Sequence, residues 1–260
     1  MAFTYSTFTD KGERENNKDC LDVIETELGL CAVLCDGLGG HESGELASKC
    51  VCESIRRGFE AASADCDTDA LAGALIDGAQ DELRRQQEEL DKKNGMKTTV
   101  CCVILSGDKC SAAYVGDSRI YHFVDGCAKE RSMDHSVPQY LVNMGEIKEK
   151  DIRRHPDRNK LVRVMGSERE KPIYQAAQFT PMQEGDAYLL CSDGFWEWIV
   201  ESDMERTLCK AASAEEWIDA MSKLVLRHGK GHHMDNYSAV AIWNGAVKKP
   251  KKFSILDMLK

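Results

Sequence analysis

Short apolar runs that end at Asp or Ser recur along the chain, and they predict buried β-strands. The first lies in "CAVLCDGLGG", where Ala32–Cys35 leads directly into Asp36. Four to eight apolar, β-branched, aromatic or Cys residues bounded by Gly, Asp or Ser are typical of a strand that ends in a turn. The further predicted strands cover Thr98–Leu105, Cys110–Asp117, Ser118–Gly126, Ala187–Asp193 and Tyr237–Trp243.

Three other segments carry apolar residues at spacings of three and four, which predicts amphipathic helices. They cover Glu42–Phe59, Thr68–Leu90 and Ala214–Arg227, and Thr68 or Asp69 is the expected N-cap of the second. The first two helices separate the earliest strand from the next, whereas the following strands succeed one another as hairpins. This segregation predicts an α+β fold in which helices cover antiparallel sheets, rather than a regularly alternating parallel sheet.

The composition narrows the choice of partners. The chain has 260 residues, 42% of them hydrophobic, and a net charge of −10. Because nucleic-acid binding depends mainly on clustered Lys and Arg, we expect no nucleic-acid partner. The N-terminal stretch has no apolar leader and no run approaches the length of a membrane span, so we expect a cytoplasmic protein with no membrane partner. Composition shifts only at "KKPKK", which predicts one domain over 1–244 and a basic tail over 245–260.

Twelve cysteines raise the question of disulfides or a zinc site. Several of them, such as Cys35 and Cys191, stand inside apolar strand-like runs, where a reduced thiol behaves as a small hydrophobic side chain. No C-x-x-C pair occurs, so the sequence gives no support for a tetrahedral zinc site. We therefore expect reduced cysteines that pack the core.

Four aspartates flank the predicted strands: Asp36, Asp117, Asp193 and Asp235. Any one of them alone is typical of a turn. An ionised carboxylate at the end of a buried strand is costly to desolvate, and no Lys or Arg is adjacent in sequence to Asp36, Asp193 or Asp235. Oxygen donors without a Cys/His cluster suit Mg²⁺ or Mn²⁺, and two such ions bridged by one carboxylate activate water and polarise a phosphoryl group.

A polar segment near the N-terminus adds a phosphate-binding candidate. In "RENNKD", Arg14 offers a planar fork suited to bidentate phosphate binding. Asn16, Asn17 and Asp19 supply oxygen atoms for outer-shell contacts to water. By itself an Arg of this kind is usually a solvated surface residue, so its weight comes from the acidic pattern that accompanies it.

Taken in order, these segments resemble the metal-dependent protein phosphatases (PPM, or protein phosphatase 2C), and in particular their bacterial serine/threonine branch. The resemblance covers about residues 6–243. The matching stretches are "RENNKD", "DGLGGHESGELAS", "VGDSRIY", "MDHS" with "LVNMGEI", "HPDRNKLVRVMGS", "GDAYLLCSDGFWEWI" and "DNYSAVAI". It implies a four-layer αββα sandwich, in which two antiparallel sheets pack together between helices and a dinuclear metal centre occupies one edge.

The resemblance also implies the bound ions and their ligands. Two ions, Mn²⁺ or Mg²⁺, would be bound, with a third ion in bacterial members. Asp36 would bridge the two ions, and the Gly37 carbonyl would bind the second. Asp193 and Asp235 would complete the first site. Asp117 would help Asp193 to hold the third ion.

The implied reaction is hydrolysis of phosphoserine or phosphothreonine by direct attack of metal-activated water, with no phosphoenzyme. In this reading Arg14, Asp36 and Asp193 are the catalytic residues, with Arg14 gripping the phosphate, and Asp19 orients water from the outer shell. The implied partners are phosphorylated proteins, including a Ser/Thr kinase whose action the enzyme opposes. A monomer is expected.

The sequence departs from the family pattern at two positions. Lys18 stands where Glu or Gln is usual, which removes an acceptor and adds repulsion near the second metal. Leu38 replaces the His of animal members, so the leaving-group proton must come from elsewhere, and water and His41 are the candidates. His41 is expected to hydrogen-bond the glycine loop, and His135 to pack and hydrogen-bond.

Several alternatives remain open from the sequence. The main one is a pseudophosphatase that binds phosphoproteins or kinases without turnover, which Lys18 favours, and a two-metal phosphodiesterase ranks third. His228 and His232 have helical metal-ligand spacing, but Gly229 and Gly231 break that helix. Ser118 and Ser192 are expected to be strand-end hydrogen-bonders. The basic stretch within 144–171 falls where the family has its flap, and its cations are candidates to contact acidic substrate segments.

Overall fold

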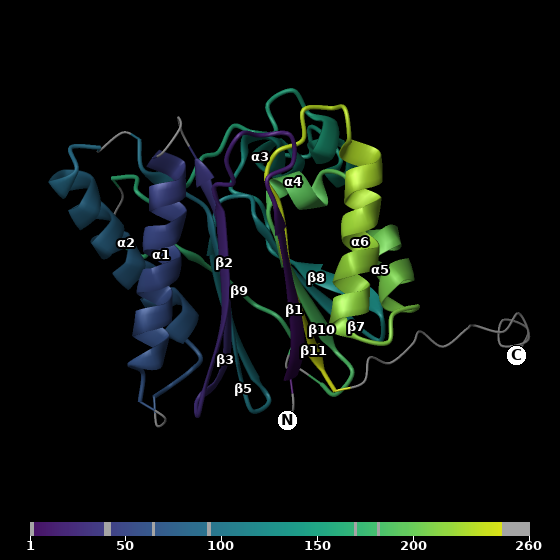
Figure 1. Ribbon diagram of the computed structural model, residues 1–260, viewed down its shortest axis with the longest axis horizontal. Coiled ribbons are helices and arrows are strands. Elements are labelled where there is room, and N and C mark those ends of the chain that lie inside the picture. The colour runs from purple at the N-terminus through teal and green to yellow at the C-terminus, as the bar shows by residue number, and fades with distance from the viewer. Residues whose placement is uncertain are drawn as a thin grey trace, which may run out of the picture.

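Two antiparallel sheets face one another between helical layers in the computed structural model (Figure 1). The structure describes residues 3–38, 43–63, 66–92, 95–168, 171–180 and 183–245. His41 and nearly all of the expected basic tail therefore lie outside the described residues. The predicted α+β class and the αββα arrangement are confirmed.

The first sheet gathers strands from both ends of the chain. Its strands, in spatial order, are β1 (Phe3–Asp10), β11 (Tyr237–Asn244), β10 (Ala187–Cys191), β7 (Arg119–Val124) and β8 (Cys127–Arg131). Every ladder in it is antiparallel. The N-terminal strand thus lies beside the last described strand, which brings the segment after β1 close to the segment before β11.

The second sheet is built from the first half of the chain and one late strand. Its spatial order is β2 (Asp19–Thr26), β3 (Gly29–Leu38), β5 (Val100–Ser106), β6 (Lys109–Val115) and β9 (Gln175–Ala177), and β4 (Lys97–Thr98) pairs with the end of β3. The register of β2 on β3 places Asp19 opposite Asp36. Two carboxylates therefore meet at one edge of this sheet.

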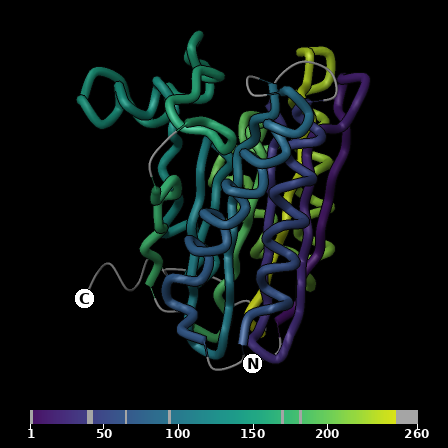
Figure 2. The backbone as a smooth tube through the Cα atoms, turned by 90° about the vertical axis from the view of Figure 1, so that its left-hand side faces the viewer, coloured from purple at the N-terminus to yellow at the C-terminus, as the bar shows by residue number. Residues whose placement is uncertain are grey.

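Helices cover the outer faces of both sheets (Figure 1). α1 (Ser43–Glu60) and α2 (Leu71–Glu89) cover the second sheet, and α6 (Ala214–Gly229) with α5 (Glu201–Leu208) and the short α4 (Asp193–Trp196) accompanies the first. Figure 2 shows the segment between β8 and β9, in teal, projecting at one end of the sandwich; it contains α3 (Val137–Asn143) and the 3₁₀ helix η1 (Glu149–Arg154). None of the described helices is long and apolar enough to cross a membrane.

The predicted N-cap of α2 is wrong. The helix begins at Leu71 after Ala70, which has no capping side chain, so neither Thr68 nor Asp69 caps it. Ser111 of β6 takes that role instead, because its hydroxyl accepts from the Ala72 amide at 3.3 Å and donates to the Asp69 carbonyl at 3.1 Å. A cap supplied by a distant strand leaves no local signal in the sequence.

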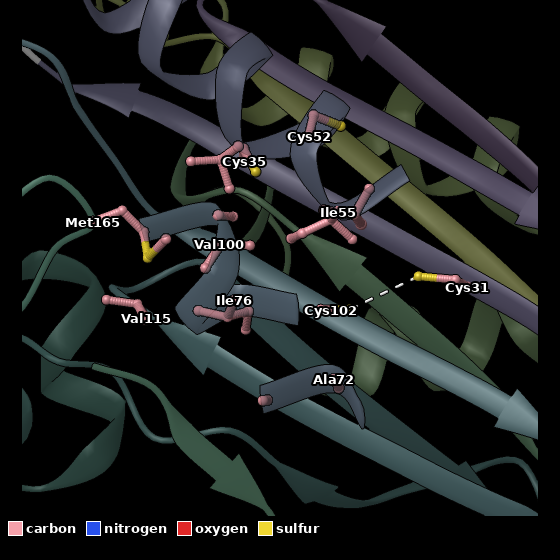
Figure 3. Close-up of a cluster of buried hydrophobic side chains, with 14 of the residues drawn as sticks. Cys31, Cys35, Cys52, Ile55, Ala72, Ile76, Val100, Cys102, Val115 and Met165 are labelled. Atoms are coloured by element: carbon pink, nitrogen blue, oxygen red, sulfur yellow. Dashed lines mark hydrogen bonds between the residues drawn. The ribbon is translucent and has the colours of Figure 1, made fainter. Parts of the chain in front are cut away.

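Seven of the twelve cysteines are buried in the core, as predicted, and the other five are partly buried. β3 is buried on both faces: Leu30, Ala32 and Leu34 face the opposite sheet, and Cys31, Val33 and Cys35 face the helices. Figure 3 shows Cys31, Cys35 and Cys52 among aliphatic side chains, and the Cys31 and Cys102 sulfur atoms lie 3.8 Å apart. No disulfide joins any of the twelve cysteines, all of which are described.

Candidate metal centre

The predicted site residues meet in one cavity of about 370 Å³ at the end of the sandwich. Its lining includes Arg14, Asp36, Gly37, Asp117, Asp193 and Asp235. These residues come from the end of β3, the loop after β6, the start of α4 and the loop before β11. Residues far apart along the sequence are thus brought together, as the acidic pattern predicted. Asp19 lies behind this lining, opposite Asp36 on β2.

Glycine follows two of the aspartates because the backbone packs too closely there for a side chain. A Cβ on Gly37 would lie 2.3 Å from the Gly44 carbonyl oxygen, so glycine lets the end of β3 approach the start of α1. A Cβ on Gly194 would lie 2.2 Å from the Asn236 carbonyl oxygen. Glycine at 194 therefore lets the loops of Asp193 and Asp235 touch.

The carboxylates repel one another in a poorly solvated space. Burial raises the pKa of Asp36 well above its usual value, and the charges of Asp19 and Asp193 add to the shift. Burial likewise raises the pKa of Asp117 well above its usual value, with Asp193 contributing. The pKa of Asp19 rises to about 7 and that of Asp193 to about 6, in both cases mainly through burial. Such a group of acids calls for a compensating cation.

Two oxygen atoms in this group have no hydrogen-bond partner. Asp19 Oδ1 and Asp193 Oδ1 are both fully buried and unpaired, whereas Asp19 Oδ2 accepts from the Ser192 hydroxyl at 2.9 Å. Within the described ranges, no three acidic, His or Cys side chains already form a finished metal cluster. The fit to divalent ions therefore rests on the donor set, which is all oxygen, and on these two orphaned atoms.

Arg14 lies at the rim of the cavity, where its guanidinium donates to Asp235 Oδ2 at 2.9 Å. No Lys or Arg is adjacent to Asp235 in the sequence, but β1 pairs with β11, which brings the Arg14 loop to the Asp235 loop. Both side chains are about half exposed, at 52% and 42%. The Arg14 fork is therefore accessible to a phosphate that enters the cavity.

Asn236 is a site residue that sequence reasoning did not single out. Its amide nitrogen donates to the carbonyls of Lys11 and Asn16, at 3.0 and 2.9 Å, and its Oδ1 accepts from the Lys18 amide at 2.8 Å. One buried side chain thus fixes the whole Arg14 loop against the Asp235 loop. Its place directly after Asp235 in "MDN" was the available signal.

Trp196 and Arg119 form a second support that the sequence did not reveal. The Trp196 indole Nε1 donates to the Asp117 carbonyl at 2.9 Å, and the Arg119 guanidinium lies 3.6 Å from the centre of the Trp196 ring. Arg119 is fully buried and makes a two-pronged ion pair with Asp134, at 2.7 and 2.8 Å. This cluster of Trp196, Arg119 and Asp134 holds the backbone of Asp117 in place.

The predictions for His135, Ser118 and Ser192 fit the structure. His135 Nδ1 accepts from the Gly116 amide at 3.0 Å, and its ring stacks on Tyr114, as expected for a packing residue. Ser192 bonds Asp19 and the Ser238 amide, and Ser118 bonds Thr99.

The projecting segment between β8 and β9 reaches the cavity. Asn159 and Leu161 belong to the lining, in the stretch where the sequence placed the flap. Beside them Arg158 donates to Glu197 at 2.6 Å, and Glu197 lies one helical turn after Asp193. The flap is thus fastened to the element that carries a predicted metal ligand.

Comparison with known proteins agrees with this geometry. The sequence profile of the family described as Protein phosphatase 2C matches residues 11–236. A serine/threonine phosphatase, stp, from Listeria welshimeri is 30% identical over 259 residues, covering 95% of this chain and 98% of that protein.

Solved structures match over nearly the whole chain. The serine/threonine phosphatase PstP/Ppp of Mycobacterium tuberculosis superposes with a TM-score of 0.81 at 27% identity, covering 94% of this chain and 100% of that one. The catalytic domain of PstP in complex with two manganese ions gives a TM-score of 0.76 at 26% identity, with coverage of 92% and 97%. This chain belongs to the protein phosphatase 2C family.

Proposed function

We propose that this chain is a metal-dependent protein phosphatase that hydrolyses phosphoserine and phosphothreonine in proteins, with Mn²⁺ or Mg²⁺ as cofactor. The observation that carries the proposal is the cavity in which Asp36, Asp117, Asp193 and Asp235 converge beside Arg14. The relatives are named serine/threonine phosphatases, and one was solved with two manganese ions. The comparisons give no support to a pseudophosphatase.

Each residue has a proposed role that follows from its place. Asp36 would hold two ions, with the Gly37 carbonyl on one of them and Asp193 and Asp235 on the other, and Asp117 is proposed for a third. When bound, such ions supply a nucleophilic water at neutral pH and polarise the phosphoryl oxygen atoms.

The chain itself binds and orients the substrate. The Arg14 fork at the rim binds the phosphate oxygen atoms, exchanging Asp235 for them. Asp19, whose Oδ1 is unpaired, lies behind the lining as an outer-shell acceptor, and Ser192 fixes its orientation.

Cysteine chemistry is not required: burial raises the pKa of Cys35, Cys101 and Cys191, which keeps these thiols protonated.

The wider assignment belongs to the same proposal. A phosphatase of this kind opposes a Ser/Thr kinase in cytoplasmic signalling, and the kinase is itself a candidate substrate. We further propose that residues 1–244 act as one catalytic domain and that the chain is a monomer. Size-exclusion chromatography with light scattering measures the oligomeric state directly.

The test is turnover by the purified protein. We expect Mn²⁺-dependent hydrolysis of p-nitrophenyl phosphate and of phosphothreonine peptides, loss of both with chelator, and no hydrolysis of bis-p-nitrophenyl phosphate. Asp193→Asn should lower kcat by at least about a hundredfold at every Mn²⁺ concentration. Arg14→Ala should mainly raise KM.

Each alternative has its own outcome. Binding of phosphopeptides without turnover across millimolar Mn²⁺ would favour the pseudophosphatase. Cleavage of the diester would favour the phosphodiesterase.

A further inference from the structure

A second depression, here called the flap groove, lies beside the metal cavity and has no part in the chemistry described so far. It has a volume of about 1010 Å³. Its lining includes Lys150, Arg153, Arg154, Arg158, Trp198 and His228. These and the other lining residues belong to η1 and the stretch after it, to the segment from the end of α4 into α5, and to the C-terminal end of α6.

The flap differs in charge from the rest of the chain. The chain as a whole carries −10, yet the 18 residues 146–163 hold seven Lys or Arg against four Asp or Glu. Two of the groove's cations are neutralised, since Arg153 pairs with Glu201 at 2.8 Å and Arg158 with Glu197 at 2.6 Å. Lys150 and Arg154 are exposed and have no ion-pair partner among the described residues. Two further acids line the groove: Asp203, which pairs with Arg206 at 2.6 Å, and Asp151, which has no ion-pair partner among the described residues. The groove therefore keeps a small net positive charge, carried by Lys150 and Arg154.

The groove lining, here including its floor at Trp198 and Val200, is partly apolar, and Trp198 is held by contacts to two histidines. The Trp198 ring stacks on His232 with 5.5 Å between ring centres, and His228 Nδ1 donates to the Trp198 carbonyl at 2.9 Å. Val200 also lines the groove and is 45% exposed. These contacts keep the floor preformed, which favours binding of an extended chain because little ordering is needed.

Groove and cavity share one wall. The Arg158–Glu197 ion pair lines the groove, while the next residue, Asn159, lines the metal cavity, and Glu197 is one turn along α4 from Asp193. A polypeptide whose phosphoresidue enters the cavity can therefore extend past this wall toward Lys150 and Arg154.

We propose that the flap groove binds an acidic segment of the phosphoprotein substrate next to the phosphoresidue, so that the enzyme selects phosphosites with Asp or Glu on one side. The proposal rests on the proposed function and names its substrate class. The two unpaired cations supply charge complementarity, and the aromatic floor accepts the intervening side chains. Small phosphate esters do not reach the groove, so changes to the groove should not alter their rate of hydrolysis.

The first test compares phosphothreonine peptides that differ only in their flanks. Each carries three Asp, Ala or Lys residues on the N-terminal or the C-terminal side. We expect the best Asp peptide to exceed the Ala peptide in kcat/KM by about tenfold at low salt, with the advantage fading as ionic strength rises. Lys150→Glu/Arg154→Glu should remove this advantage and leave the Ala peptide and p-nitrophenyl phosphate unchanged.

A matched control has the same charge change elsewhere. Arg57→Glu/Lys210→Glu alters one exposed Arg on α1 and one exposed Lys just before α6, at the end remote from His228. This variant should keep the preference for acidic flanks. Equal rates for Asp and Ala peptides in the wild-type enzyme, or equal losses in both double variants, would overturn the proposal.

A binding measurement separates this proposal from the proposed function. Fluorescence anisotropy of a labelled, unphosphorylated acidic peptide needs no turnover. We expect Lys150→Glu/Arg154→Glu to weaken its binding at least about fivefold and the control variant to leave it unchanged. If the peptide binding changes in this way while Mn²⁺ produces no phosphatase activity, the proposed function is wrong and the proposal for the flap groove is retained. If turnover is normal and the double variant binds the acidic peptide as well as the wild type does, the proposal for the flap groove is wrong.

Discussion

At the scale of single residues, Lys18 is the feature that sets this metal centre apart from the family pattern. Its backbone is fixed from both sides, because its amide donates to Asn236 and its carbonyl accepts from the Ser48 hydroxyl at 2.6 Å. Lys18 also contributes to the lining of the metal cavity. An ammonium group turned toward the carboxylates would compete with a divalent ion. We expect Lys18→Glu to lower the Mn²⁺ concentration for half-maximal turnover by about fivefold, equivalent to about 1 kcal/mol.

Lys18→Met is the companion variant, since it removes the charge and keeps the length of the side chain. It should give part of the gain, and the remainder in Lys18→Glu then measures the added acceptor. An unchanged Mn²⁺ midpoint in both variants would contradict the prediction, because it would mean that the ammonium group stays in solvent. A Mn²⁺ titration at saturating p-nitrophenyl phosphate provides the comparison.

At the scale of elements, the strands that could be predicted from the sequence are those whose apolar positions stand out from the polar positions around them. β3 and β10 are buried on both faces, so their apolar runs and terminal aspartates are visible in the sequence. β1 is mostly exposed, and "FTYSTFTD" therefore carries no apolar run to announce it. Asp36 and Asp193 were predictable for the same reason. For Asn236 the sequence offered only its place next to Asp235, since its three hydrogen bonds join loops that meet only after β1 pairs with β11.

The short helix α4 carries Asp193 and, through Trp196, supports the Asp117 loop. Trp196→Phe keeps an aromatic ring over Arg119 and removes the hydrogen bond from Nε1 to the Asp117 carbonyl. Losing one such hydrogen bond destabilises the Asp117 loop by about 1 kcal/mol. We expect the Mn²⁺ requirement to rise about fivefold, while kcat at saturating Mn²⁺ stays within about twofold. Isothermal titration with Mn²⁺ gives a readout independent of turnover.

Trp217→Phe is the matched control. Trp217 is fully buried on α6, and its Nε1 donates to a backbone carbonyl, that of Met204, at 3.1 Å. The same chemical change there should lower thermal stability without changing the Mn²⁺ requirement. If both variants shift the Mn²⁺ midpoint equally, Trp196 contributes only to general packing and the prediction is wrong.

At the scale of the whole molecule, the carboxylate cluster links stability to pH. The folded-state pKa is raised to about 7 for Asp19 and to about 6 for Asp193, mainly by burial, and the pKa of nearby Glu197 is also raised to about 7 by burial and by Asp193. Their unfolded-state values lie near 4. Between these limits the folded chain binds more protons than the unfolded chain, so its stability falls as pH rises.

The metal-free protein should therefore lose stability between pH 5 and pH 7.5, and Mn²⁺ should reverse the trend because it displaces those protons. Each excess proton changes the free energy of unfolding by about 1.4 kcal/mol per pH unit, or about 3–6 °C in Tm for a chain of this size. Thermal unfolding in chelator and in Mn²⁺ measures both slopes, and the Tm gain from Mn²⁺ should grow with pH. Asp193→Asn should flatten the metal-free slope, whereas Asp203→Asn, which removes a carboxylate paired with Arg206 at 2.6 Å on α5, should not. A Tm gain that is independent of pH would show that these carboxylates do not exchange protons for metal.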